Sequence, residues 1–247
     1  MSSKFFKLNH DSKTEVLLLS SPHFSRTLDQ QEIAIGNSFV TSVPKAKNIG
    51  VTFDSTKSFQ THTSSVCKSC FFHLRNIGSI RKYLTTDATI KLVHAFVTSK
   101  IDYCNSLLYG LPDSQLNKLQ RVLNTAARIV SLTPKFTPIS HVLVSLHWLP
   151  IRKRVQFKIL LITFKALNGL APAYLSGLLS LYSPTRQLRS SEGNLLTIKR
   201  VNSTFGERAF SNSAPYLWNN LPQHIRCNSS LETFKKQIKT FLFTNDV

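Results

Sequence analysis

Acidic residues are scarce in this chain of 247 residues, which carries 12 Asp and Glu against 31 Lys and Arg and has a formal charge of +19. Four cysteines are too few at this length for a secreted disulfide scaffold, and eight glycines with ten prolines exclude a collagen-like chain. Apolar runs such as residues 16–19 are far shorter than the roughly 18–20 residues that a membrane-spanning helix needs. Residues 1–7 lack the apolar segment of a signal peptide, so the sequence predicts an intracellular protein of the nucleus or cytoplasm.

The chain is nevertheless rich in apolar side chains. Hydrophobic residues make up 42% of it, and 17 of them are Phe, which predicts a folded core rather than a disordered chain. The length suggests one large domain or two small ones. With a charge of +19, nucleic acid is the first candidate partner and an anionic membrane surface the second, while a basic surface without a partner is the alternative.

The positive charge is concentrated in one part of the sequence. Between Asp113 and Glu192 lie 78 residues with no acidic side chain and with 11 Lys or Arg, whereas residues 1–113 have a net charge of +5 and residues 192–247 one of +3. The same stretch is rich in Leu, Val, Ile and Phe, so we expect it to fold rather than to form a solvated tail. Since it holds no carboxylate of its own, a phosphate backbone is the expected counter-charge, and binding would release counterions.

Hydrophobic periodicity predicts an α+β fold that is mainly α. Apolar runs at residues 15–20, 33–40 and 48–54 are typical of strands and predict a small N-terminal antiparallel sheet, with a turn at Gly36-Asn37 dividing the run at 33–40 into two extended pieces. Helical spacing then predicts helices over residues 58–83 and 86–108, after residues 112–114, over 151–168, after Pro172, and over 205–220 and 230–243. The Asn168-Gly169 pair predicts where the helix over 151–168 ends. Residues 183–203 are expected to form a loop with a strand at 195–198. The predicted segments are the sheet region (1–57), a helical bundle (58–182) and a short C-terminal helical segment (183–247).

Two of the helices predicted within this acid-free stretch carry basic side chains. The helix after residues 112–114 has an apolar stripe of Leu116, Leu119, Leu123, Ala126 and Val130 and a basic face on another side. The helix after Pro150 opens with three consecutive basic residues. The candidate phosphate-binding residues are Lys118, Arg121 and Arg128 of the first helix and Arg152, Lys153, Arg154 and Lys158 of the second. Phosphate contacts carry no sequence information, so binding without sequence specificity is expected.

No catalytic motif is found in the sequence. Cys67 and Cys70 form a CxxC pair, but the second pair that a zinc site usually needs is missing, so core packing is the preferred interpretation. The sequence holds no HExxH, GxGxxG, Walker A or GxSxG motif and no clustered carboxylates suited to Mg²⁺. Phe157 and Phe164 could stack on bases, but their seven-residue spacing favours the core.

A series of short motifs runs along nearly the whole chain. In order, it comprises residues 8–9 and 13–18, Asn48-Ile49-Gly50-Val51-Thr52-Phe53-Asp54, residues 92–97, 102–108 and 126–128, Leu146-His147-Trp148-Leu149-Pro150, and residues 158–160, 165–172, 188–191, 214–222 and 234–235. This series resembles the C-terminal part of reverse transcriptases encoded by LINE-type, non-LTR retrotransposons of the jockey and chicken-repeat kind.

The resemblance implies a role for each segment. Residues 1–57 correspond to a palm remnant with a primer-grip-like hairpin at Ile49 and Gly50, residues 58–182 to the thumb, and residues 183–247 to the C-terminal region. The thumb of related polymerases lies along the template–primer duplex, so the implied partner is an RNA/DNA duplex and not a membrane. Two departures stand out: three residues separate Asn9 from Lys13 where the family has two, and Ile49 replaces the usual Leu.

The resemblance also implies what is missing. The family's Mg²⁺-binding Tyr-Ala-Asp-Asp motif does not occur in this sequence. We therefore expect a fragment that binds template–primer but does not polymerise alone, with no catalytic residue, metal site or cofactor, Mg²⁺ belonging only to the full-length family enzyme. The alternatives are an exapted RNA- or protein-binding module and a non-functional pseudogene product.

Overall fold

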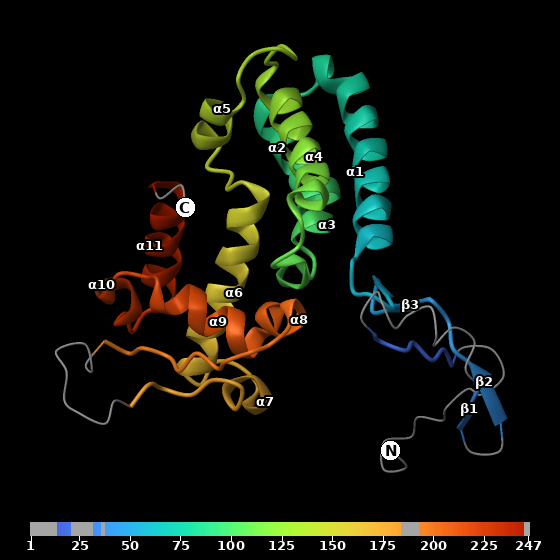
Figure 1. Cartoon of the computed structure of the whole chain (residues 1–247). Coiled ribbons are helices and arrows are strands. Elements are labelled where there is room, and N and C mark those ends of the chain that lie inside the picture. Colours follow the sequence, from blue (N-terminus) through green and yellow to red (C-terminus); the bar gives the residue numbers. More distant parts are fainter. Residues whose placement is uncertain (1–13, 21–31, 36–37, 184–192, 245–247) are drawn as a thin grey trace. The chain divides into compact units, whose positions relative to one another are not determined.

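The computed structural model describes residues 14–20, 32–35, 38–183 and 193–244 (Figure 1). It divides into two compact units, Met1–Lys68 and Ser69–Val247, with the division inside helix α1 (Gln60–Ile80). The first unit holds two β-hairpins, and the second is built from helices. This arrangement confirms the predicted α+β, mainly α fold with a small antiparallel N-terminal part.

The hairpins of the first unit are separate two-stranded sheets. Strand β1 (Glu32–Ile35) pairs antiparallel with β2 (Ser38–Thr41), and β3 (Lys45–Asn48) pairs antiparallel with β4 (Val51–Asp54). The prediction of a single strand over residues 48–54 is wrong, because the chain reverses at Ile49 and Gly50. Their φ angles of 45° and 80° are both positive, as a two-residue type I′ turn requires.

The prediction of a strand over residues 15–20 is also wrong. Val16 forms one isolated parallel bridge with Ser42, and its carbonyl accepts a hydrogen bond from the N–H of Val43 at 2.8 Å. A single bridge fixes the chain but does not extend into a ladder, so no third strand joins the hairpins within the described residues. The Gly36–Asn37 turn expected between the first two strands lies outside the described residues.

Asp54 connects the second hairpin to α1. Its Oδ2 accepts hydrogen bonds from Thr56 Oγ1 (2.7 Å) and from the N–H of Ser58 (2.8 Å), and its Oδ1 accepts from the N–H of Phe59 (2.8 Å). The backbone groups just before a helix have no partner within it, so this buried carboxylate satisfies them where α1 begins. The ring of Phe59 packs edge-on against Phe53 at 5.5 Å.

In the second unit, α2 (Thr86–Val93), η4 (His94–Thr98) and α3 (Ser99–Asp102) follow one another without a break. Thr85 caps this helix, as Oγ1 accepts from the N–H of Ala88 at 3.2 Å. The helix ends at Asp102 and not at Leu108 as predicted. Cys104 adopts a left-handed conformation (φ 52°), which interrupts the helical hydrogen bonds, and a separate 3-10 turn η5 (Asn105–Leu108) follows.

The 3-10 turn η3 (Arg81–Tyr83), which follows α1, and eight further helices complete the described part of this unit: α4 (Asp113–Ser131), α5 (Ser140–Ser145), α6 (Ile151–Leu167), α7 (Ala173–Ser176), α8 (Thr204–Arg208), α9 (Phe210–Asn219), α10 (Gln223–Arg226) and α11 (Leu231–Thr244). The predicted helix over 205–220 breaks into α8 and α9 because Ala209 is extended (ψ 144°). Helices α5 and α10 were not predicted. The expected strand at 195–198 is reduced to one bridge between Leu181 and Leu196.

The helices of this unit bury two groups of apolar side chains. The first lies where α2 packs on α4, and all five predicted apolar positions of α4 are buried. The second forms where α9 and α11 pack on α6 (Figure 1). There Phe164 stacks on Phe234 with ring centroids 4.3 Å apart, and Trp218 lies 5.7 Å from Phe234. The prediction of a core position is confirmed for Phe164, whereas Phe157 is only half-buried.

Candidate nucleic-acid interface

The basic face of α4 holds three of the candidate residues. Arg121 is exposed, while Lys118 and Arg128 are half-buried. The guanidinium of Arg128 bonds the backbone carbonyls of Pro134 and Thr137, the second at 2.8 Å. Arg128 therefore stabilises the loop that follows α4, which leaves Lys118 and Arg121 as the two cations of this face most open to a phosphate.

Helix α6 begins against α4. The N–H of Ile151 donates to the side-chain carbonyl of Gln120 at 2.8 Å, which satisfies one of the free N–H groups at the start of α6. This contact sets where the three consecutive basic residues of α6 begin. Successive residues of a helix point about 100° apart, so Arg152, Lys153 and Arg154 face three different directions and do not form one patch.

The structure gives each of these three residues different surroundings. Arg152 is exposed and forms an ion pair with Asp113. Lys153 is buried, with 7% of its surface exposed. Arg154 forms an ion pair with Asp102 at 2.7 Å, and its side chain is 13% exposed. The expectation of a phosphate counter-charge for this stretch is therefore corrected at two positions, since carboxylates from outside the stretch pair with Arg152 and Arg154.

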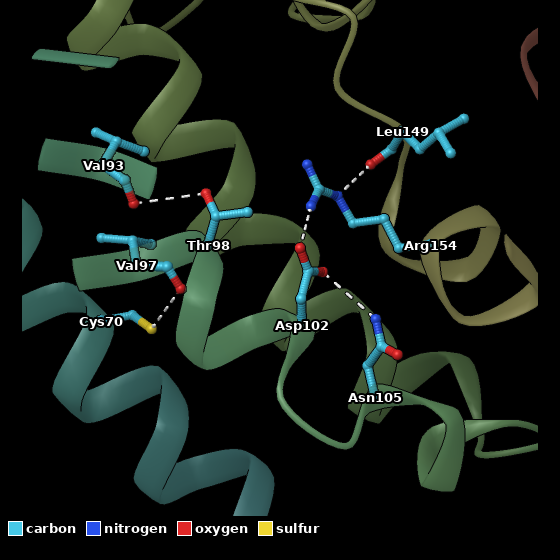
Figure 2. A network of polar contacts seen from close by, with 8 residues as sticks. All are labelled: Cys70, Val93, Val97, Thr98, Asp102, Asn105, Leu149 and Arg154. Carbon is cyan, nitrogen blue, oxygen red and sulfur yellow. Dashed lines mark hydrogen bonds and ion pairs between the residues drawn. The ribbon is translucent and has the colours of Figure 1, made fainter. Parts of the chain in front are cut away.

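Figure 2 shows the network around Arg154. Its Nε donates to the carbonyl of Leu149 at 2.8 Å, and Asp102 accepts from both Arg154 and the side-chain amide of Asn105, the latter at 3.4 Å. The network ties the end of α3 and the start of η5 to the first turn of α6. Arg154 therefore stabilises the packing of these elements, and it also lies at the edge of a cleft.

That cleft has a volume of about 420 Å³. Its walls come from η4, α3, η5, the 146–149 loop, α6 and α11, and they include His94, Asp102, Arg154, Lys158 and Lys239. Partial desolvation lowers the pKa of His94, and the charge of Arg154 lowers it further while Asp102 opposes the shift. The ring of His94 packs edge-on against Trp148 at 5.5 Å. We name this hollow the α6 cleft.

Lys158 is the predicted site residue that lines this cleft together with Arg154. The two lie one helical turn apart on α6 and share a face of it. Sequence reasoning missed His94 and Lys239 as cleft residues. Lys239 comes from α11, and only the packing of α11 on α6 brings it here, so no local pattern could have indicated it.

The primer-grip-like residues lie in the other unit, at the tip of the second hairpin. Ile49 is 81% exposed there, although β-branched side chains disfavour a positive φ. Cys67 and Cys70 are both buried, and Cys70 Sγ lies 3.8 Å from the carbonyl of Val97. Within the described ranges no group of three His, Cys, Asp or Glu side chains is placed to hold a metal ion.

No described helix is both long and apolar enough to cross a membrane. Comparisons of the chain with protein-family models, with curated proteins and with solved structures found no match.

Proposed function

We propose that this chain is the late-palm, thumb and C-terminal part of a LINE-type reverse transcriptase, acting inside the cell, and that it binds an RNA/DNA duplex through its phosphates. One observation carries the proposal beyond the motif resemblance. Lys118, Arg121 and Lys158 have no carboxylate partner among the residues that the structure describes, although two of the neighbouring arginines do. Basic side chains left without internal partners on two packed helices suit a polyanion.

We also propose that this chain does not polymerise DNA on its own. Phosphoryl transfer relies on carboxylates that position Mg²⁺, and the Tyr-Ala-Asp-Asp motif that supplies them in the family does not occur in the sequence. Incubation with primer–template, deoxynucleotides and Mg²⁺ should therefore give no extension. Robust extension would contradict this part of the proposal without touching duplex binding.

Duplex binding is tested by fluorescence anisotropy with a labelled RNA/DNA duplex over a range of salt concentrations. The double variant Lys118→Gln with Arg121→Gln should bind more weakly and reduce the slope of log K against log salt by about two, one for each phosphate that is no longer neutralised. The matched control is Lys199→Gln with Arg200→Gln, which removes the same charge from two exposed residues of another segment.

The control separates a localised interface from a general effect of charge. If both double variants reduce the slope equally, the binding is spread over the surface and the α4 face is not an interface. If neither changes the slope, the thumb assignment loses its support. Arg152, Lys153 and Arg154 are unsuitable for this test, because two of them form ion pairs and the third is buried.

A further inference from the structure

Three irregularities of the backbone border the α6 cleft. His94–Thr98 form a π-helical turn, and both end residues of that turn line the cleft. Cys104, directly before the lining residue Asn105, has a φ of 52°, and His147, itself in the wall, has a φ of 55°. π-turns and left-handed non-glycine residues cost free energy and gather at functional sites. Their convergence on one hollow marks it as a candidate binding site.

The side chains of the cleft are suited to an anion that also has a flat apolar part. Arg154, Lys158 and Lys239 bring three positive charges against the single carboxylate of Asp102. A phosphate monoester carries about −1.5 to −2 charge at pH 7, which complements this excess. Beside these charges lie the aromatic rings of His94, Trp148 and Phe157, and bases stack on such rings.

Asn105 supplies an independent sign of a missing partner. It is only 4% exposed, and its Oδ1 has no hydrogen-bond partner among the described residues. The amide nitrogen is turned to Asp102, so the oxygen points away from that carboxylate (Figure 2). A buried carbonyl without a donor is costly, and a ligand with an N–H group would satisfy it. The Watson–Crick edges of nucleobases carry such groups.

We propose that the α6 cleft binds one nucleoside monophosphate unit, with its phosphate toward Lys158 and Lys239 and its base toward Asn105 and the aromatic wall. A volume of about 420 Å³ falls in the range of small-ligand sites, about 300–1,000 Å³, and is too small for a length of duplex. The unit can be a free nucleotide or an unpaired nucleotide of a bound strand. The second source rests on the proposed function, while the first does not.

Calorimetry with AMP, adenosine and inorganic phosphate tests the site on the whole chain. AMP should bind about tenfold more tightly than either fragment, because only AMP makes both sets of contacts. Lys239→Gln should weaken AMP binding about tenfold, because it removes a charge-assisted hydrogen bond to the phosphate. Lys236→Gln, at an exposed position of the same helix and outside the cleft, is the matched control and should bind AMP normally.

Asn105→Ala gives a second, independent variant. It should weaken AMP and adenosine but leave phosphate binding unchanged, and an unaltered His94 imidazole NMR signal in the free protein would show that the cleft is intact. Equal affinities for AMP and phosphate, equal effects of Lys239→Gln and Lys236→Gln, or no AMP binding at millimolar concentration would each overturn the proposal.

Duplexes separate the two sources and the two proposals. A blunt RNA/DNA duplex tests the proposed function, and the same duplex with one unpaired terminal nucleotide tests whether the strand supplies the unit. Tighter binding of the overhang, abolished in Lys239→Gln but not in Lys236→Gln, supports the strand as the source. AMP binding without an overhang effect supports a free nucleotide. AMP binding with no duplex binding at all leaves the site standing and removes the thumb proposal.

Discussion

The guanidinium of Arg154 lies 2.7 Å from the carboxylate of Asp102, although 52 residues separate them in the sequence. Their side chains are 13% and 39% exposed, so the pair is partly withdrawn from water. Arg152, two positions earlier on the same helix, pairs with Asp113 while the two side chains stay 54% and 69% exposed. Two ion pairs of the same chemistry thus differ chiefly in burial.

This difference predicts unequal costs for two matched substitutions. Arg154→Met should lower the free energy of unfolding by about 2–3 kcal/mol, because it leaves Asp102 without its charged donor and frees the Leu149 carbonyl. Arg152→Met should cost less than about 1 kcal/mol, as expected for an exposed pair. Urea unfolding followed by tryptophan fluorescence measures both changes in stability, since Trp148 and Trp218 lie in the second unit, as both ion pairs do. Equal costs would show that burial does not distinguish the pairs.

The titration of His94 should lower the free energy of unfolding of the second unit in mild acid. Partial desolvation and the charge of Arg154 lower the pKa of His94 in the folded chain below its unfolded value of about 6.5. The folded state then binds fewer protons than the unfolded state, so the stabilising contribution is present above pH 6.5 and is lost as the pH falls through the folded pKa. Asp102→Asn should lower the pKa of His94 further, since the Asp102 charge opposes the shift.

An NMR titration of the His94 imidazole measures this pKa, and urea unfolding at a series of pH values measures the stability. His94→Gln should flatten the pH dependence of unfolding. A pKa of His94 above 6.5 would contradict the predicted sign.

Asp54 should stabilise the start of α1 through the hydrogen bonds that its carboxylate accepts there. Burial alone would raise the pKa of its carboxyl, but the hydrogen bonds from Thr56, Ser58 and Phe59 outweigh burial and hold that pKa below its usual value. Asp54→Ala should therefore cost about 2 kcal/mol of local stability, and Thr56→Val, which removes one of these bonds, about 1 kcal/mol or less. Hydrogen exchange at the Ser58 and Phe59 amides measures both.

The Asp54 carboxylate's contribution to this stability is present above the unfolded pKa of about 4 and is lost as the pH falls through the lower folded value. Unchanged protection in Asp54→Ala would contradict this role.

Local sequence patterns predicted those parts of the fold that depend on residues close together in the chain. The Asn168-Gly169 pair predicted the end of α6, and Gly169 indeed takes a φ of 70° there. The apolar stripe of α4 likewise predicted which of its residues are buried. Both depend on interactions within about one helical turn, which a linear pattern records.

The candidate site depended on contacts that no local pattern contains. The prediction treated the basic stretch as lacking counter-charges, because the nearest carboxylates lie outside it in the sequence. Asp113 and Asp102 reach Arg152 and Arg154 across 39 and 52 residues, respectively. Lys239 enters the α6 cleft only through the packing of α11. The charge of the stretch could thus be counted from the sequence, but its distribution between internal pairs and open surface could not.

The turn at Ile49 and Gly50 offers a test of both strain and function. Glycine takes a positive φ freely, but a β-branched residue at a φ of 45° is strained, and Asn-Gly is the favoured pair for such a turn. Ile49→Asn should stabilise the hairpin by about 1 kcal/mol. Ile49→Gly should gain less, because glycine also increases the entropy of the unfolded chain. Hydrogen exchange of the β3 and β4 amides measures the gain, and a loss of protection in Ile49→Asn would contradict the left-handed turn.

The same two variants test the primer-grip-like assignment. If the exposed Ile49 side chain contacts the primer strand, both variants should bind primer–template more weakly than the parent chain, even though their hairpins are more stable. Strain retained at an exposed position would then be explained by binding, since stability alone favours its removal. Anisotropy with the same duplex used for the α4 face gives the comparison. Unchanged affinity in both variants would remove Ile49 from the interface and leave the α4 and α6 cations as its remaining candidates.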